Sequence, residues 1–137
     1  MRRAVSGILV TIAAALVLSG CGGDAGGASV QEAAVHMRYS AFEPGEIVVR
    51  AGQPVVITIE NGDPITHEWI VGTSDVHDRH RTGTEPFHDQ IPSEVTVPAF
   101  EMRKTMLTFE VPGEYQFICH LPGHEAYGMA GTLRVVD

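Results

Sequence analysis

From residue 30 onward, the sequence consists of short runs in which apolar and polar residues alternate, separated by turn residues. Within residues 54–60, for example, Val55, Ile57 and Ile59 fall on one face, which is the pattern of a half-buried strand. No segment shows sustained helical periodicity with caps. Strands are predicted over residues 30–37, 47–50, 54–60, 66–71, 106–111, 115–119 and 131–136. The pattern predicts an all-β Greek-key β-sandwich or barrel of about seven to eight strands.

One polar stretch, residues 73–92, interrupts this pattern. It is long for a connection, which is uncommon unless the segment has a function or is disordered. It contains His77, His80 and His88, and a helical turn would place the first two on one face. The stretch is interpreted either as a solvated loop or as a second, weaker metal site at these three histidines.

The segment from Cys119 to Met129 carries a thiol, an imidazole at His124 and a thioether, five residues apart in each case. These are ligands that copper prefers. Two imidazoles and a thiolate with a weak axial thioether define a blue-copper electron-transfer site. The loop supplies three of those four ligands. His67, which follows a turn and opens a predicted strand, is the first candidate for the missing imidazole.

Residues 30–137 resemble a small blue-copper protein of the cupredoxin superfamily, the group that includes plastocyanin, azurin and rusticyanin. The resemblance lies in Asn61-Gly62-Asp63-Pro64-Ile65-Thr66-His67 and in Phe117-Ile118-Cys119 with the loop through Gly131. It implies a cupredoxin-like fold and one type 1 copper ion. The ligands that it implies are His67, Cys119, His124 and Met129.

Two positions, Glu68 and His120, differ from or extend this resemblance. Several family members carry an asparagine after the first histidine, where this chain has Glu68, so that contact is not transferred. In larger copper oxidases, a histidine directly after the cysteine relays electrons to a second copper. Here His120 is expected to point away from Cys119 by strand alternation and to lie at the surface rather than bind metal.

The N-terminus reads as an export signal. Residues 1–20 combine Arg2 and Arg3 with an apolar run, and the run ends in Leu-Ser-Gly before Cys21. This ending resembles the lipobox of bacterial lipoproteins, which implies lipidation of Cys21; the alternative is a plain signal peptide or an uncleaved anchor. Residues 21–29, rich in Gly and Ala, are expected to form a flexible tether of about 16 Å before a domain over residues 30–137.

The charge of the chain limits its partners. Seventeen Asp and Glu residues oppose nine Lys and Arg residues, for a net charge of −8. Loss of residues 1–20 would also remove Arg2 and Arg3 and bring the net charge to −10. Such an acidic chain argues against nucleic acid as a partner, because nucleic-acid binding requires a basic face.

These features favour a non-enzymatic copper protein that transfers single electrons outside the cytoplasm. A monomer is expected, held by its lipid anchor on the outer or periplasmic side of the cell membrane and meeting a redox partner transiently. The alternative is a copper-handling or copper-resistance protein that binds, stores or delivers the metal. A copper enzyme is disfavoured, because ligands for a substrate-binding copper from a second domain are missing.

Overall fold

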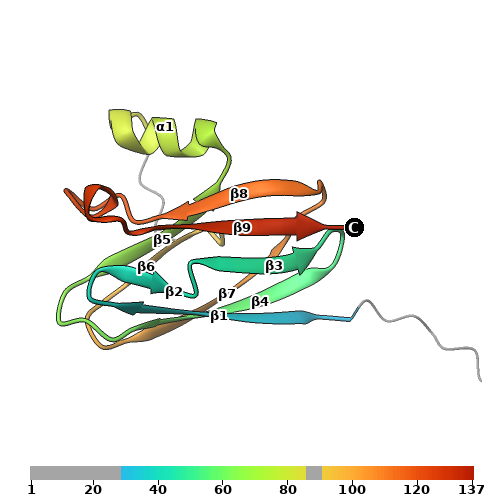
Figure 1. Ribbon diagram of the computed structural model, residues 1–137, viewed down its shortest axis with the longest axis horizontal. Coiled ribbons are helices and arrows are strands. Elements are labelled where there is room, and N and C mark those ends of the chain that lie inside the picture. The colour runs from blue at the N-terminus through green and yellow to red at the C-terminus, as the bar shows by residue number, and fades with distance from the viewer. Residues whose placement is uncertain (1–28, 86–90) are drawn as a thin grey trace, which may run out of the picture.

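A computed structural model describes residues 29–85 and 91–137 and shows two β-sheets packed face to face (Figure 1). One sheet has the strand order β2-β1-β4-β7 and the other the order β3-β9-β8-β5-β6. The sheets are separate, so the fold is the predicted sandwich rather than a barrel. The nine strands are β1 (Gln31–Arg38), β2 (Ala41–Glu43), β3 (Glu46–Arg50), β4 (Pro54–Asn61), β5 (His67–Gly72), β6 (Glu94–Val97), β7 (Met102–Thr108), β8 (Gly113–Ile118) and β9 (Ala130–Val136).

The predicted all-β class is confirmed, and two of the nine strands, β2 and β6, were not predicted. Both are short, with three and four residues. The sheets mix strand directions: β1 runs parallel to β4 and β3 parallel to β9, whereas β8 pairs antiparallel with both β5 and β9. The last two pairings place the end of β8 between the start of β9 and β5, where the candidate site lies.

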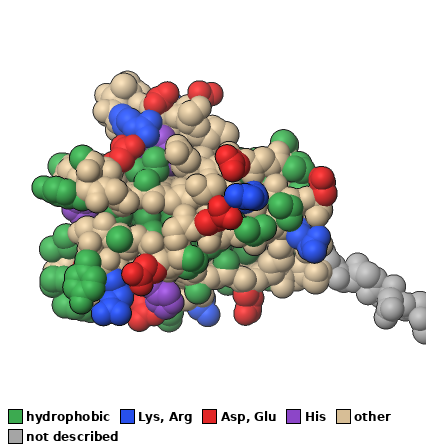
Figure 2. All heavy atoms as spheres, viewed as in Figure 1, with side chains coloured by type: hydrophobic (Ala, Val, Ile, Leu, Met, Phe, Trp, Pro, Cys, Tyr) green, Lys and Arg blue, Asp and Glu red, His purple; other side chains and the backbone are tan. Residues whose placement is uncertain are grey.

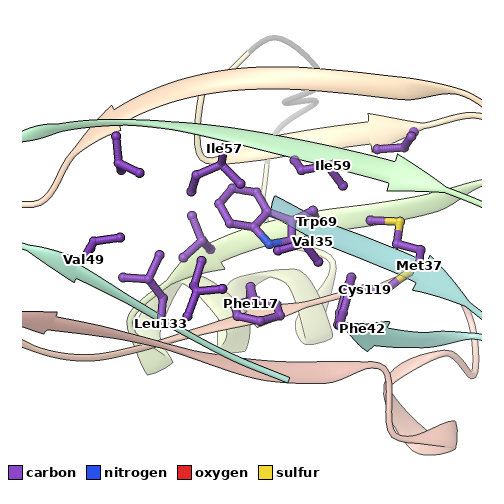
Figure 3. Packing of buried hydrophobic residues seen from close by; sticks show 14 of the residues in the cluster. Val35, Met37, Phe42, Val49, Ile57, Ile59, Trp69, Phe117, Cys119 and Leu133 are labelled. Atoms are coloured by element: carbon purple, nitrogen blue, oxygen red, sulfur yellow. The ribbon is translucent and has the colours of Figure 1, made fainter. Parts of the chain in front are cut away.

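The core lies between the sheets and follows the period of the strands. On β4, Val55, Ile57 and Ile59 are fully buried, as their alternation predicts. Trp69 of β5 lies in the middle of the core, with Ile57 and Ile59 on one side and Phe117 on the other (Figure 3). Fully burying one such side chain contributes about 1.5–3 kcal/mol. The core therefore fixes β5 and β8, the strands that lead into the candidate site.

The polar stretch contains an element that the sequence did not predict, the helix α1 (Ser74–Thr82). The sequence shows no sustained helical periodicity here, yet a helix forms and carries both His77 and His80. Gly83 caps the C-terminus of the helix with a left-handed φ of 67°, and its N–H donates to the carbonyls of Arg79 and His80. The helix has no row of buried aliphatic side chains on one face. Its buried residue is His77 instead.

The helix lies on the outer face of the five-stranded sheet, above β8 (Figure 1). It starts directly after β5, and Gly72 permits this close approach. A Cβ at Gly72 would lie 2.7 Å from Cβ of Val76, closer than real side chains come. His88 lies outside the described residues.

In the part of the chain that the structure describes, no helix is long and apolar enough to cross a membrane. The predicted signal segment, Cys21 and nearly all of the tether lie outside the described residues.

Candidate metal centre

Three of the predicted ligands converge at one end of the sandwich. His67 is the first residue of β5, Cys119 directly follows β8, and His124 precedes the short helix η1 (Glu125–Tyr127). Their ligand atoms all lie within 4.8 Å of one another. Nδ1 of His124 is 3.1 Å from Nδ1 of His67 and 3.3 Å from Sγ of Cys119. The arrangement presents two imidazole nitrogens and a sulfur to a common point.

Met129, the fourth predicted ligand, is fully buried beside this group. Its N–H donates to the carbonyl of His124, and its carbonyl accepts from the N–H of Cys119, each at 3.1 Å. The ligand loop is thus closed on itself by backbone hydrogen bonds at both ends. His67, Cys119, His124 and Met129 are arranged as a type 1 copper site.

Two glycines allow the loop to turn this tightly. Gly123 and Gly128 have φ values of 86° and 95°, a conformation that residues with a Cβ rarely adopt. The turn at Gly123 brings the N–H of His124 to the carbonyl of Leu121 at 3.0 Å. The loop geometry therefore returns His124 to Cys119.

Asp63 holds the ring of His67 and is the functional residue that sequence reasoning missed. Its Oδ2 lies 2.9 Å from Nε2 of His67. A carboxylate can only accept, so the ring proton sits on Nε2 and the Nδ1 lone pair faces the other ligands. Although burial opposes it, the pKa of Asp63 is lowered by the N–H groups of Ser40 and Tyr39 and by His67. The sequence signal was a carboxylate four residues before the histidine, within the stretch 61–67 that carries the family resemblance.

Cys119 is fully buried, and the N–H of Glu68 donates to its Sγ at 3.3 Å. Burial raises the pKa of this thiol, despite the N–H groups of Glu68 and Leu121. A bound cation reverses this balance, because a coordinating thiol is deprotonated outright. The residue at position 68 thus contacts the cysteine through its backbone.

Asn61 ties the turn before β5 to the end of β6. Its side-chain nitrogen donates to the carbonyls of Ile65 and Val97, at 2.7 and 2.9 Å, and also reaches that of Pro98 at 3.1 Å. Its oxygen accepts from the N–H of Asp63 at 2.9 Å. This buried amide fixes the segment from residue 61 to residue 67 against the end of β6.

His120 does not lie at the surface as expected, although it does turn away from the core that holds Cys119. Its side chain is only 7% exposed, and its Nε2 lies 2.9 Å from Nδ1 of His77 on α1. Burial and the neighbouring His77 and His80 lower the pKa of His120 to about 4. Burial likewise lowers the pKa of His77. Two of the three histidines of the polar stretch thus meet His120, and the third, His88, lies outside the described residues.

The chain resembles known copper proteins over most of its length. Residues 29–136 match the model of the family described as copper binding proteins, plastocyanin/azurin family. A copper-resistant cuproprotein, CopI, from Rubrivivax gelatinosus is 31% identical over 97 residues. That match covers 69% of this chain but only 59% of the relative, so the chain spans less than two thirds of it.

Solved structures show the same fold. A reduced auracyanin from Roseiflexus castenholzii superposes with a TM-score of 0.67 at 23% identity, covering 81% of this chain and all of that one. Rusticyanin from Thiobacillus ferrooxidans gives a TM-score of 0.58 at 17% identity, covering 78% of this chain and 77% of that one.

Proposed function

The chain belongs to the plastocyanin/azurin family of copper-binding proteins, and from that premise we propose that it transfers single electrons through one type 1 copper ion. The observation that carries the proposal is the convergence of His67 Nδ1, His124 Nδ1 and Cys119 Sγ within 4.8 Å. A bound copper ion supplies the change between the Cu(II) and Cu(I) states.

The surrounding residues keep this ligand set in place. Asp63 fixes the tautomer and orientation of His67, and the N–H of Glu68 holds the sulfur of Cys119. Asn61 holds the backbone at Ile65, just before His67, against Val97 at the end of β6. Such outer contacts orient ligands and tune a metal site. A site held from several directions changes little in shape between two charge states, which favours fast electron exchange.

His124 is the ligand nearest to solvent. It is half-buried, whereas His67 and Cys119 are fully buried. Exposed apolar side chains gather at this end of the sandwich, seen at the left of Figure 2, and they include Ile65, Phe100 and Tyr127. We infer that electrons enter and leave through the edge of His124. An apolar surface of this kind suits a small and transient contact with a redox partner.

The first test is the visible and paramagnetic-resonance spectrum of the Cu(II) protein. The intense copper–thiolate band of a type 1 site is expected, and Cys119→Ala should abolish it. A colourless Cu(II) protein would contradict the proposal. Reversible one-electron voltammetry then tests the transfer itself, and sluggish or irreversible cycling would argue against an electron carrier.

The second candidate function is copper resistance by binding or delivering the metal. It is favoured by the relative from Rubrivivax gelatinosus, whose name describes a copper-resistant cuproprotein. Metal exchange separates the two functions. A copper handler should release its ion readily to a competing chelator, whereas an electron carrier should retain it while cycling. Neither function requires catalysis, and turnover of nitrite or a phenol by the purified protein would overturn a non-enzymatic role.

We also propose that the protein works as a monomer outside the cytoplasm, attached to the membrane through a lipid on Cys21. The support is the sequence Leu18-Ser19-Gly20-Cys21 after an apolar run. Metabolic labelling with a radioactive fatty acid should mark the wild type and not Cys21→Ala. Equal labelling of both, or of neither, would refute the anchor. Without residues 1–20 the net charge is −10, which favours a basic partner, and the rate of reaction with that partner should fall as salt rises.

A further inference from the structure

The two imidazole ligands of the type 1 site are held in different ways. Nε2 of His67 bonds to the carboxylate of Asp63, which fixes the orientation of that ring. Within residues 29–85 and 91–137, the ring of His124 makes its polar contacts through Nδ1, toward His67 and Cys119. No carboxylate or carbonyl of these residues takes the part for His124 that Asp63 takes for His67. The position of His124 therefore depends on the backbone that carries it.

The backbone around His124 forms one tight turn. The carbonyl of His124 accepts from the N–H groups of Tyr127 and Met129, each at 3.1 Å. The N–H of Gly128 donates to the carbonyl of Glu125 at 2.9 Å. Glu125 directly follows His124 and is the first residue of η1. The residues of this turn are thus bonded to one another, and a contact that fixes Glu125 also fixes His124.

A salt bridge from α1 holds Glu125. Nε of Arg81 donates to both carboxylate oxygens of Glu125, each at 3.1 Å, and Nη2 donates to Oε1 at 2.6 Å. Nη1 of Arg81 bonds at 2.8 Å to Asp78, one turn earlier on the helix. A forked guanidinium–carboxylate pair within such a network holds a defined geometry, which an isolated exposed ion pair does not. Arg81 therefore fixes where Glu125 lies.

The helix that supplies Arg81 is itself fixed to the sheet (Figure 1). His77 lies four residues before Arg81, on the same face of α1, and is fully buried. Its Nε2 is 3.2 Å from the carbonyl oxygen of Gln116 on β8 and donates to it, because a carbonyl can only accept. The guanidinium of Arg81 therefore extends from a fixed support.

A cavity lies between α1 and the loop that carries the ligands. It has a volume of about 270 Å³ and is lined by residues of both segments, among them Arg81 from the helix and Pro122, Gly123 and Glu125 from the loop. Close apolar packing therefore does not fix the loop on this side. The ion pair between Arg81 and Glu125 joins the two walls of the cavity.

From this geometry we propose that Arg81 is a positioning residue for the copper ligand His124. It acts through Glu125 and is not a ligand itself. The inference rests on the proposed type 1 site for its effect on copper, but its effect on the loop exists in the metal-free protein as well. Its role is to hold a half-buried ligand in one geometry for both oxidation states, so that less of the loop must rearrange when an electron is transferred.

The first test needs no metal. Amide hydrogen exchange is measured for the N–H groups of Tyr127, Gly128 and Met129 in the purified, metal-free full chain. In Arg81→Gln these groups should exchange about two- to fivefold faster than in the wild type, because the turn opens more readily without the ion pair. The N–H of Phe117 on β8 should keep its exchange rate, which shows that the sandwich is still folded.

The matched control is Arg79→Gln. It removes the same charge from the same helix, but Arg79 pairs with Glu85 and not with the ligand loop. This variant should leave the exchange of the loop unaltered. Arg81→Lys keeps the charge and loses the planar fork, so it should accelerate the exchange by a smaller factor. It also serves as the milder variant if α1 unfolds in Arg81→Gln.

A double variant tests whether Arg81 acts through Glu125. Because the two residues share one contact, Arg81→Gln/Glu125→Gln should exchange no faster than the faster of the two single variants. Effects that multiply would mean that Arg81 acts on the loop in another way, and would overturn the proposal.

The copper-loaded protein gives the second readout. Arg81→Gln should keep the copper–thiolate band, bind copper about two- to fivefold less tightly in competition with a chelator, and exchange electrons with an electrode more slowly. Arg79→Gln should match the wild type in all three measurements. A residue that only stabilised the fold would lower the urea midpoint without changing the affinity or the electron-transfer rate.

The proposal is overturned if Arg81→Gln leaves the exchange of the loop unchanged, or if Arg79→Gln accelerates it equally. Faster exchange with unaltered copper affinity and electron-transfer rate would also overturn it, because the loop would then move without moving the ligand. A wild type that lacks the thiolate band while Arg81→Gln still accelerates the exchange would refute the type 1 site alone, so the two failures are distinguishable.

Discussion

Oδ2 of Asp63 and Nε2 of His67 lie 2.9 Å apart, and the carboxylate decides which nitrogen of a buried copper ligand carries the proton. The same carboxylate accepts the N–H groups of Tyr39 and Ser40, at 2.7 and 2.8 Å. Its position is thus fixed by the turn after β1, in the other sheet. The orientation of His67 in the five-stranded sheet is therefore set by backbone N–H groups at the end of a strand of the four-stranded sheet.

Replacing Asp63 should therefore weaken copper binding without removing a ligand. In Asp63→Ala, His67 loses the acceptor that fixes its tautomer. Loss of such a contact lowers metal affinity about 10–100-fold. Competition with a chelator measures the change. Asp75→Ala, which removes an exposed carboxylate on α1, is the matched control and should leave the affinity unaltered; an equal loss in both variants would contradict a specific role for Asp63.

Acid should destabilise the metal-free protein through the same residue. The pKa of Asp63 is lowered in the folded state, so its stabilisation is complete above the ordinary carboxyl pKa of 3.8. It is lost as the pH falls through the lower folded-state value. Urea unfolding from neutral to acid pH should show a steeper fall in the free energy of unfolding for the wild type than for Asp63→Asn. Parallel pH curves would contradict this prediction.

Gly72→Ala should disturb α1 and leave the type 1 site intact. The added Cβ would meet Val76, at 2.7 Å from its Cβ, and would push the first turn of the helix outward. Such overpacking costs about 1–3 kcal/mol. We expect a lower urea midpoint and an unchanged copper–thiolate band. Gly45→Ala is the control, because a Cβ there meets nothing within 4 Å; equal effects of both changes would show that the contact with Val76 is unimportant.

Met129→Leu should keep the intense band and raise the reduction potential. The side chain stays apolar and similar in size, while the weak axial donor, which tunes the potential of such a site, is removed. Cu(I) tolerates the lower coordination number better than Cu(II) does. Each tenfold loss of Cu(II) binding relative to Cu(I) corresponds to about 59 mV for one electron. Voltammetry of the wild type and the variant measures the shift. An unchanged or lower potential would mean that Met129 is packing material and not an axial ligand.

Much of the fold was predictable because the strands of the core show their period in the sequence. Val55, Ile57 and Ile59 alternate without exception, and all three are fully buried. The ligands from Cys119 to Met129 were predictable from residue type and spacing, because a single short loop carries three of them. His67 was a candidate from its place after a turn and at the start of a strand, and the resemblance to a family supported the same residue.

The features that escaped prediction depend on contacts between distant segments. The helix α1 buries imidazoles rather than aliphatic side chains, so hydrophobic periodicity gives no signal for it. His120 was expected at the surface because alternation turns it away from the core. Alternation alone does not reveal that a helix covers that face. Asp63 was given no role of its own, because its bond to His67 depends on the three-dimensional course of the loop.

The turn of His120 away from the core has a mechanical consequence. Cys119 and His120 are neighbours in the chain, one with its sulfur in the core and the other with its ring beneath α1. Any rotation of the backbone at the end of β8 must therefore move both side chains at once, in opposite senses relative to the sheet. The Arg81–Glu125 ion pair joins the same helix to the loop that carries His124. A displacement of α1 thus reaches the copper ligands by two routes, so that the helix can change the shape of a site to which it contributes no ligand.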